Sequence, residues 1–313
     1  MAKHDSAKYA FLYLLSLVAL VFMSISVGII VFQIINKQIV DIINDYMINY
    51  NDGAMKFAIS AIIVATPIYY LTSRQIYKQL FQGILDKDAG VRKWLTYFIL
   101  LVSVVVMIGF LISTINTFLG GDLTLKFILK TLTALAISGS VFSFYFYDIK
   151  RSEVQGKKDK VISIYALASL AIVLVVFVTS WFFVDSPAQT RNKKIDQEIV
   201  SNFYEINSAI NDRYTLNGEI PSDLDALVSD GGGYRLSDKS IVHPLSGQKY
   251  QYEILTEDEY KICAEFLTSN LDSDQRDFYY PGDYRHDKGY QCFSQKAQAL
   301  TDSKMPPAPV RVP

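Results

Sequence analysis

Three aspartates in the last third of the 313-residue chain could bind calcium. Asp272, Asp274 and Asp277 supply carboxylate oxygens along one polar stretch, and calcium prefers such ligands spaced along a flexible loop. The spacing does not complete an EF-hand, because no glycine or terminal glutamate falls in register. We therefore interpret these side chains as solvated loop carboxylates, with a calcium site as the alternative.

Tyrosines surround a histidine in the residues that follow. Exposed tyrosines are effective contact residues, so the group could form a surface for a peptide or a glycan. The same tyrosines could instead cover the open edge of a sheet or face a membrane, and the sequence leaves that choice open. The group comprises Tyr279, Tyr280, Tyr284, His286 and Tyr290.

No motif predicts catalysis or a cofactor. His286 has no second histidine near it in the sequence, and His243 precedes Pro244, which is typical of a turn. The sequence also lacks the glycine-rich phosphate loops, the G-x-S-x-G nucleophile elbow and the H-E-x-x-H zinc motif. We expect no cofactor, no resident metal and no catalytic residue.

The chain has two cysteines, Cys263 and Cys292. An even pair in an exported domain usually forms a disulfide, and closing a loop of this size stabilises a domain by roughly 3 to 4 kcal/mol. A reactive thiol pair would need a C-x-x-C spacing or basic neighbours. The pair therefore predicts a structural disulfide.

Five apolar stretches precede the candidate residues in the chain, and they are the first elements of the predicted architecture. Only 19% of the residues are charged, below the roughly 25% of soluble proteins, and about 20 apolar residues suffice for a helix to cross a bilayer. The second stretch is short and contains Pro67, which membrane helices tolerate, and the first is too long for a signal peptide. The stretches cover residues 9–35, 57–72, 94–117, 127–147 and 161–184.

The positions of lysine and arginine predict the orientation of these spans. Both residues are frequent after the second stretch and after the fourth, and scarce in the other loops. Cytoplasmic loops carry such an excess, so we expect a cytoplasmic N-terminus in a cell membrane and an extracytoplasmic segment after residue 184. The net charge of −1 gives no support for nucleic-acid binding.

The interiors of the five stretches contain no charged residue. The charge-free intervals lie between Lys8 and Lys37, Lys56 and Arg74, Lys93 and Asp122, Lys130 and Asp148, and Lys160 and Asp185. Charges inside a membrane mark proton relays and ion paths, so this pattern argues against an ion-coupled transporter and an intramembrane hydrolase. Small residues in the last two stretches predict close contacts between helices. They are Ala134, Ala136, Ser138, Gly139 and Ser140 in the fourth, and Ala166, Ala168, Ser169 and Ala171 in the fifth.

The runs "YLLSLVALVFMSISVGIIVFQIIN", "VRKWLTYFILLVSVVVMIGFLISTINTFLGGDLTLKFILK" and "FYFYDIKR" resemble a bacterial four-span membrane module of unknown function. The resemblance covers roughly residues 5–152 and implies an architecture without a reaction. Its recognisable residues include Arg92, Lys93, Trp94 and Asp122. These residues lie at the ends of the stretches, where anchoring of helices is the preferred interpretation.

After residue 184 the pattern changes to that of a small α+β domain. Apolar residues at Ile195, Ile199, Phe203, Ile206 and Ile210 form one stripe of a helix. Asp185 or Ser186 would cap this helix with Pro187 in its first turn, and Asn217-Gly218 would end it. A shorter helix is expected from Ser222.

Two alternating runs predict a hairpin that covers the helix stripe. The first contains Tyr250, Tyr252 and Ile254, and the second contains Tyr260, Ile262, Ala264 and Phe266. The segments "NGEIPSDLDAL", "HPLSGQKYQYEI" and "YKICAEF" resemble the globular part of type II secretion pseudopilins. That resemblance implies a long helix against an antiparallel sheet, and often a disulfide near the C-terminus.

We therefore expect a membrane module over residues 1–152, a loop and fifth span over 153–184, an extracytoplasmic domain over 185–300 and a Pro-rich disordered tail over 301–313. The preferred function is non-enzymatic: a domain anchored in the lipid bilayer that binds an extracytoplasmic protein or glycan. The alternatives are a component related to pilus or secretion machinery, and a transporter or membrane enzyme built from the spans. The sequence does not predict an oligomeric state.

Overall fold

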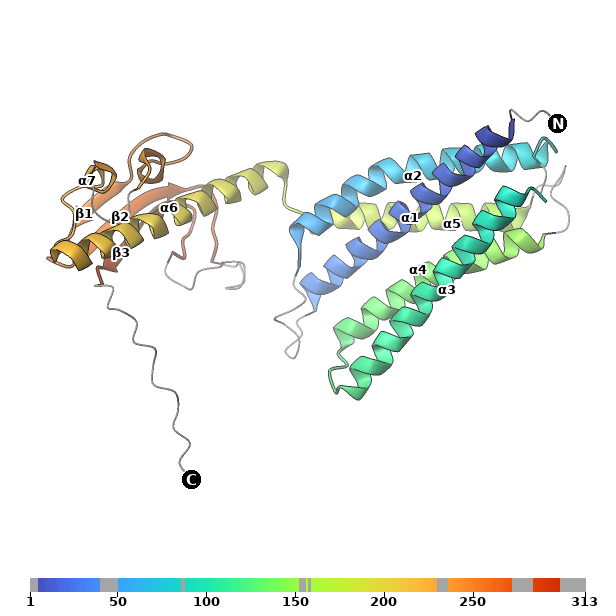
Figure 1. Ribbon diagram of the computed structural model, residues 1–313, viewed down its shortest axis with the longest axis horizontal. Helices are drawn as coiled ribbons and strands as arrows, with labels where there is room; N and C mark the ends of the chain where they lie inside the picture. Colours follow the sequence, from blue (N-terminus) through green and yellow to red (C-terminus); the bar gives the residue numbers. More distant parts are fainter. Residues whose placement is uncertain are drawn as a thin grey trace, which may run out of the picture. The chain divides into compact units, whose positions relative to one another are not determined.

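A computed structural model describes residues 5–39, 50–85, 88–151, 156, 159–229, 236–271 and 284–298. The chain divides into two compact units, Met1–Val184 and Asp185–Pro313, and the first is helical while the second combines helices with a sheet (Figure 1). The predicted calcium ligands Asp272, Asp274 and Asp277, together with Tyr279, Tyr280 and the Pro-rich tail, lie outside the described residues.

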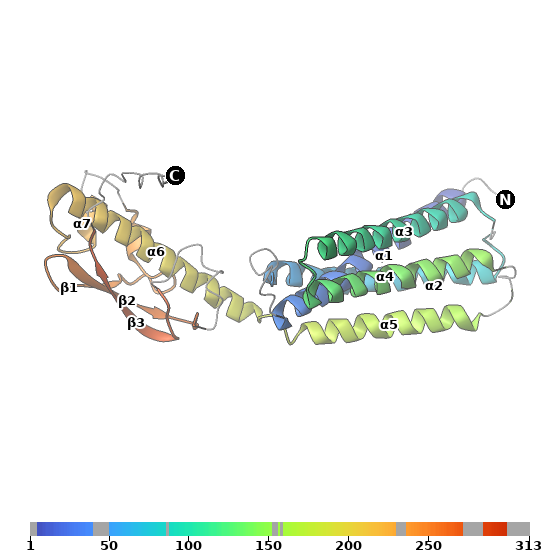
Figure 2. The same ribbon diagram turned by 90° about the horizontal axis from the view of Figure 1, so that it is seen from below.

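Each predicted apolar stretch is a helix that is long and apolar enough to cross a membrane. The helices run side by side, as the two views of Figures 1 and 2 show, with α1 packed along α2 and α3 along α4. Their bounds are α1 Asp5–Gln38, α2 Asp52–Phe81, α3 Gly90–Leu119, α4 Leu125–Lys150 and α5 Lys160–Ser180.

All five helices differ from their predicted bounds by one or more residues, and for α2 and α5 the contacts explain the difference. Helix α2 continues through Pro67 and well past Thr72, because Ile76 and Leu80 keep an apolar side that packs in a small buried cluster with residues of α1. Helix α5 ends at Ser180, before Val184, since the following amides donate to carbonyls three residues back. Neither the extension of α2 nor the early end of α5 is visible in the sequence as a change in an uninterrupted apolar run.

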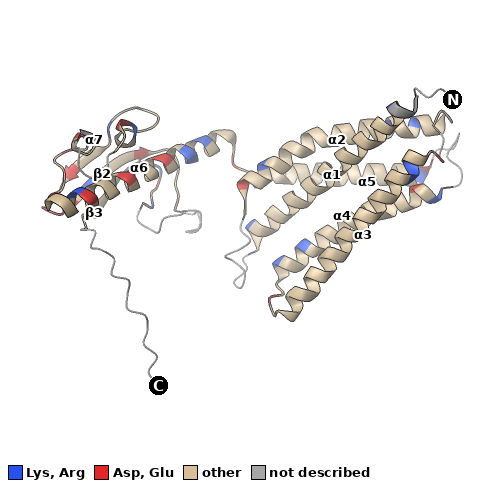
Figure 3. Cartoon of the chain, viewed as in Figure 1, with Lys and Arg blue, Asp and Glu red and all other residues tan. Residues whose placement is uncertain are grey.

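The ends of the helices carry most of the charges of the helical unit, and their middle parts are largely uncharged (Figure 3). Three of these ends have polar N-caps, which satisfy backbone N–H groups that lack a partner within the helix. Asn51 accepts from Ala54 N at 2.8 Å, Thr124 caps α4, and Asp159 caps α5. The core between α1 and α2 includes Ile30 and Met55.

In the second unit α6 (Pro187–Asn217) packs on the sheet. Ser186 and Gln189 form a capping box with Pro187 at the first helical positions, and Gly218 ends the helix at φ 75°, a left-handed conformation that favours glycine. The predicted caps are therefore confirmed. Of the predicted stripe, Ile199, Phe203, Ile206 and Ile210 are fully buried, and Ile195 lies at the margin of the core.

The sheet is antiparallel in the order β1-β2-β3, so the predicted hairpin has a third strand beside it. The strands are β1 Gln251–Ile254, β2 Glu259–Phe266 and β3 Gly289–Lys296. The apolar side of β2 joins the core formed with α6. Ile254, expected on that side, is 45% exposed, because it is the last residue of β1, an edge strand of the sheet.

Two short helices connect α6 to the sheet. Helix α7 (Asp225–Ser229) begins later than predicted, since Asp223 rather than Ser222 accepts from the first amides, at 2.9 Å from Ala226 N. A 3-10 helix, η1 (Asp238–Ile241), follows. Leu227 of α7 and Ile241 of η1 complete the core above α6.

Candidate functional site

A chain of buried ion pairs joins three helices at one end of the helical unit. The guanidinium of Arg92 on α3 donates to the Asp148 carboxylate of α4 at 2.6 Å and to the Asp148 backbone carbonyl at 3.2 Å. Arg151 donates to the other Asp148 oxygen at 2.8 Å, and lies 3.5 Å from Asp159, the cap of α5. Tyr147 also donates to Asp159, at 3.0 Å.

We call Arg92, Asp148, Arg151 and Asp159 the ion-pair clamp. The side chains of Arg92 and Asp148 are only 7% and 5% exposed, so neither group meets the surface as an interfacial anchor would. Each carboxylate faces an arginine and the two signs balance. The clamp therefore suits holding α3, α4 and α5 together better than moving a proton.

The clamp changes the interpretation of two sequence features. Arg92 was expected to anchor a helix end at an interface, and it instead anchors α3 to α4 inside the protein. Charged groups are thus buried in this unit after all, near the ends of its helices: Arg92 and Asp148 at the clamp, and Lys126 and Lys130 in the first two turns of α4. Lys93 and Trp94 are exposed, as interfacial anchors would be, with Lys93 paired to Asp88 at 2.7 Å.

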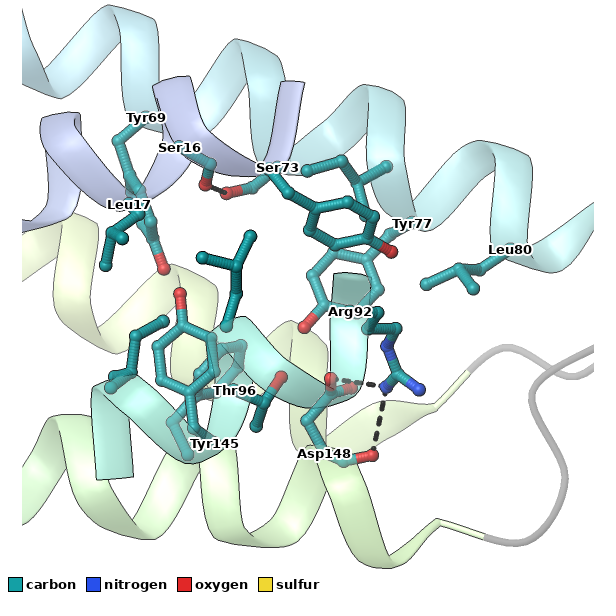
Figure 4. A pocket seen from close by; sticks show the side chains of 15 residues that line it. Ser16, Leu17, Tyr69, Ser73, Tyr77, Leu80, Arg92, Thr96, Tyr145 and Asp148 are labelled. Carbon is teal, nitrogen blue, oxygen red and sulfur yellow. Dashed lines mark hydrogen bonds and ion pairs between the residues drawn. The ribbon is translucent and has the colours of Figure 1, made fainter. Parts of the chain in front are cut away.

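Beside the clamp lies a cavity of about 40 Å³ lined by hydroxyl groups and apolar side chains, with Arg92 and Asp148 in its wall (Figure 4). Ser16 and Ser73 share a hydrogen bond of 3.3 Å across α1 and α2. The hydroxyls of Tyr69 and Tyr145 point toward one another in Figure 4. This cavity is large enough for a water molecule, and too small for an organic substrate.

A larger cleft of about 590 Å³ adjoins this cavity and shares Tyr69, Ser73 and Tyr145 with it. Helices α1, α2, α4 and α5 all contribute to its walls, and we call it the α5 cleft. Its lining is mostly apolar, with a few hydroxyl groups; Tyr70 and Ser169 lie 2.7 Å apart between α2 and α5. A cleft of this size and character is typical of a ligand site.

The predicted disulfide is confirmed in the second unit. Cys263 of β2 and Cys292 of β3 are direct partners across the antiparallel ladder, with their sulfur atoms 2.12 Å apart. The bridge ties β3 to the hairpin beside it. The part of the chain that the structure describes contains no cluster of three or more histidine, cysteine or acidic residues that could hold a metal.

Two members of the predicted tyrosine surface belong to the core instead. Tyr284 is 4% exposed and His286 is 2% exposed; Tyr284 packs on Phe203, and His286 stacks on Phe266 with ring centres 3.8 Å apart. Neither can contact a partner directly. Tyr290 is 57% exposed on β3 and bonds to Gln251 of β1.

Polar groups hold His286 in this buried position. Asn270 accepts from His286 N at 2.8 Å and donates to the Tyr284 carbonyl at 3.1 Å. Asp196 on α6 accepts from Leu267 N and from Thr268 N at 2.8 and 2.7 Å. Burial lowers the pKa of His286 below its ordinary value, so at neutral pH the ring is uncharged.

His243 lies in the turn predicted for it. Its Nδ1 accepts from Leu245 N at 3.1 Å, and its Nε2 lies 3.0 Å from the Glu265 carbonyl. Both ring nitrogens have partners within the fold. The ring therefore fixes the turn after η1.

Residues 9–145 match DUF5671, a domain of unknown function. This confirms the resemblance of the first four helices to a domain of unknown function, and it covers less than half of the chain. Neither a curated protein nor a solved structure matches the chain. The comparisons thus show no pseudopilin resemblance for the second unit, and that resemblance stays a prediction.

Proposed function

We propose that this chain is a multi-pass membrane protein whose five helices carry a non-enzymatic binding domain on the extracytoplasmic side. The observation that carries the proposal is the apolar exterior of the helical unit. Large apolar side chains on α3 and α5 are exposed, among them Leu119 at 78% and Leu167 at 72%. Soluble proteins rarely expose continuous apolar surface of this kind, whereas a bilayer covers it.

The contacts at the two helix ends support the alternating topology. Gly156 N donates to the Phe81 carbonyl at 3.0 Å, so the two lysine- and arginine-rich loops meet at the end that holds the clamp. At the other end the Tyr50 hydroxyl donates to the Phe183 carbonyl at 2.7 Å, and Lys37 donates to the same oxygen. The positive-inside rule then favours a cytoplasmic clamp.

An extracytoplasmic location for the second unit has independent support from its chemistry. Disulfides persist in oxidising compartments and are rare in the cytosol, and this unit is bridged by Cys263 and Cys292. We favour binding over catalysis because the buried charges of the clamp pair with one another. The exposed Tyr290 beside Gln251 offers one contact surface for a protein or glycan.

Labelling of single cysteines in intact cells tests the topology. Starting from a Cys263→Ala/Cys292→Ala variant, Gly120→Cys and Leu216→Cys should react with an impermeant maleimide, and Gln82→Cys should react only after lysis. All three positions are exposed in the structure. Reaction of Gln82→Cys in intact cells, or protection of Leu216→Cys, would reject the orientation.

A separate measurement tests the binding role. The second unit should retain its binding of extracytoplasmic partners when Asp148 or Arg92 of the clamp is replaced, and lose it when Tyr290→Ala removes the exposed ring. Crosslinking in intact cells, followed by identification of the attached molecules, provides the readout. Leu245→Ala is the matched control, since Leu245 is 58% exposed and lies in the turn after η1 rather than on β3. Equal crosslinking in all variants would contradict a contact surface at Tyr290.

A further inference from the structure

We propose that the α5 cleft binds a phospholipid with an anionic headgroup, with one acyl chain held along α5. The inference rests on the membrane insertion proposed above and adds a ligand to it. The volume of about 590 Å³ lies within the range of small-molecule sites. Apolar side chains from all four helices form most of the wall, including Met23, Val27, Val141 and Val173.

Small side chains create this volume. Ala136 and Ser140 of α4 and Ala166 and Ser169 of α5 were expected to bring helices into close contact, and they line the cleft instead. Only Val173 and Ser180 of α5 are buried. The small side chains thus leave a gap between α5 and the neighbouring helices, and larger side chains would have filled that gap.

The length and depth of the cleft match one leaflet of a bilayer. Its α5 wall extends from Ile162 to Val173, which is about 16 Å at the helical rise of about 1.5 Å per residue. The hydrocarbon core of a bilayer is about 30 Å thick. Because this wall starts next to the clamp, at the proposed cytoplasmic end, it corresponds to the inner leaflet.

Arg74 supplies the charge that selects the headgroup. It lines the same end of the cleft, is exposed, and makes no hydrogen bond or ion pair within the described residues. An arginine near the membrane surface attracts a headgroup with a net negative charge, whereas in a zwitterionic headgroup the ammonium group offsets the phosphate. The arginines of the clamp are different, since Asp148 and Asp159 already neutralise them. An anionic phospholipid therefore complements both the apolar wall and its charged end.

Photolabelling in vesicles tests this assignment. The full chain is reconstituted in phosphatidylcholine containing a minor fraction of phosphatidylglycerol with a photoactivatable group in one acyl chain, and labelled peptides are mapped by mass spectrometry. We expect labels on α4 and α5 around the cleft. Ala166→Phe, which fills the cleft, should remove most of them, and Ala168→Phe, an exposed site of the same helix outside the lining, should not.

A second pair of variants tests the headgroup. Arg74→Gln should lower labelling by the anionic probe about fivefold, the factor for one basic residue near an anionic membrane surface, and leave labelling by a zwitterionic probe unchanged. Lys78→Gln, one turn away, is the control. Labelling spread evenly over the exposed faces of α3 and α5, or unchanged by Ala166→Phe, would overturn the inference.

The topology test separates this inference from the proposal it rests on. Impermeant labelling of Gly120→Cys and Gln82→Cys in the same vesicles reports insertion. Insertion without cleft labelling overturns the lipid site alone. Failure of insertion overturns both.

Discussion

The two units of this chain differ in how many of their large apolar side chains lie outside. In the α+β unit Phe203 lies at the centre of a cluster of rings that includes Tyr250, Phe266 and Phe293. In the helical unit Ile30 and Met55 are likewise buried between α1 and α2, but other large apolar side chains, such as Phe182 and Leu167, lie outside, and paired charges are buried at the clamp. Under the proposed membrane insertion, the comparison teaches that each unit is organised by its solvent: water drives rings inward, and lipid removes that driving force between helices.

The clamp offers the largest expected effect in the helical unit. Asp148→Asn leaves Arg92 and Arg151 buried without the carboxylate between them, and removing one partner of a buried ion pair costs about 3 to 5 kcal/mol. Pulse proteolysis of the full chain in detergent micelles measures the loss. Asp88→Asn is the control, because its pair with Lys93 is exposed and such pairs contribute about 0 to 1 kcal/mol. Equal losses for both variants would show that the clamp does not hold the helices.

In the second unit we expect a loss of similar size from Phe203→Ala. The side chain is fully buried, and truncation of a buried phenylalanine costs about 3 to 5 kcal/mol. Leu167→Ala, on the exposed side of α5, should change stability little in the same assay. If Leu167→Ala were the more damaging, the exterior of the helical unit would be a protein contact rather than a lipid-facing surface.

Reduction of the disulfide should destabilise the second unit and leave the helical unit unchanged. Loss of the bridge between Cys263 and Cys292, 29 residues apart, should lower the free energy of unfolding by roughly 3 to 4 kcal/mol. Hydrogen exchange with and without reductant resolves the two units. A Cys263→Ser/Cys292→Ser variant, insensitive to reductant, is the control, and faster exchange in α1–α5 would contradict the expected independence.

A smaller effect should appear as acid sensitivity of the second unit. The folded pKa of His286 is lowered by burial, so the unfolded chain binds the proton more readily as pH falls through the ordinary range of histidine, about 6.5. Stability is therefore retained above that value and declines below it. His286→Phe should flatten the dependence between about pH 7.5 and 5.5. An unchanged slope in this variant would assign the sensitivity to another group.

Local patterns predicted much of this architecture. The stripe from Ile199 to Ile210, the cap at Ser186 and the stop at Gly218 depend on neighbours within one helix, and each was predicted correctly. Strand β3 was missed because only Phe293 among its alternating residues packs against the core. The pairing of β3 depends on β2 rather than on the composition of β3 itself. The burial of His286 was missed for the same reason, since Asn270 and Phe266 hold it from other segments.

The sequence by itself determined the elements: five apolar helices, their alternating charges, the stripe of α6 and the paired cysteines. It could do so because helix periodicity, caps and transfer into lipid are properties of contiguous residues. Only the tertiary structure decided that Arg92 meets Asp148, and that Ala136 and Ala166 border a cleft instead of a tight contact. Distances between helices come from many weak packing contacts summed over the whole bundle, and no single segment encodes them.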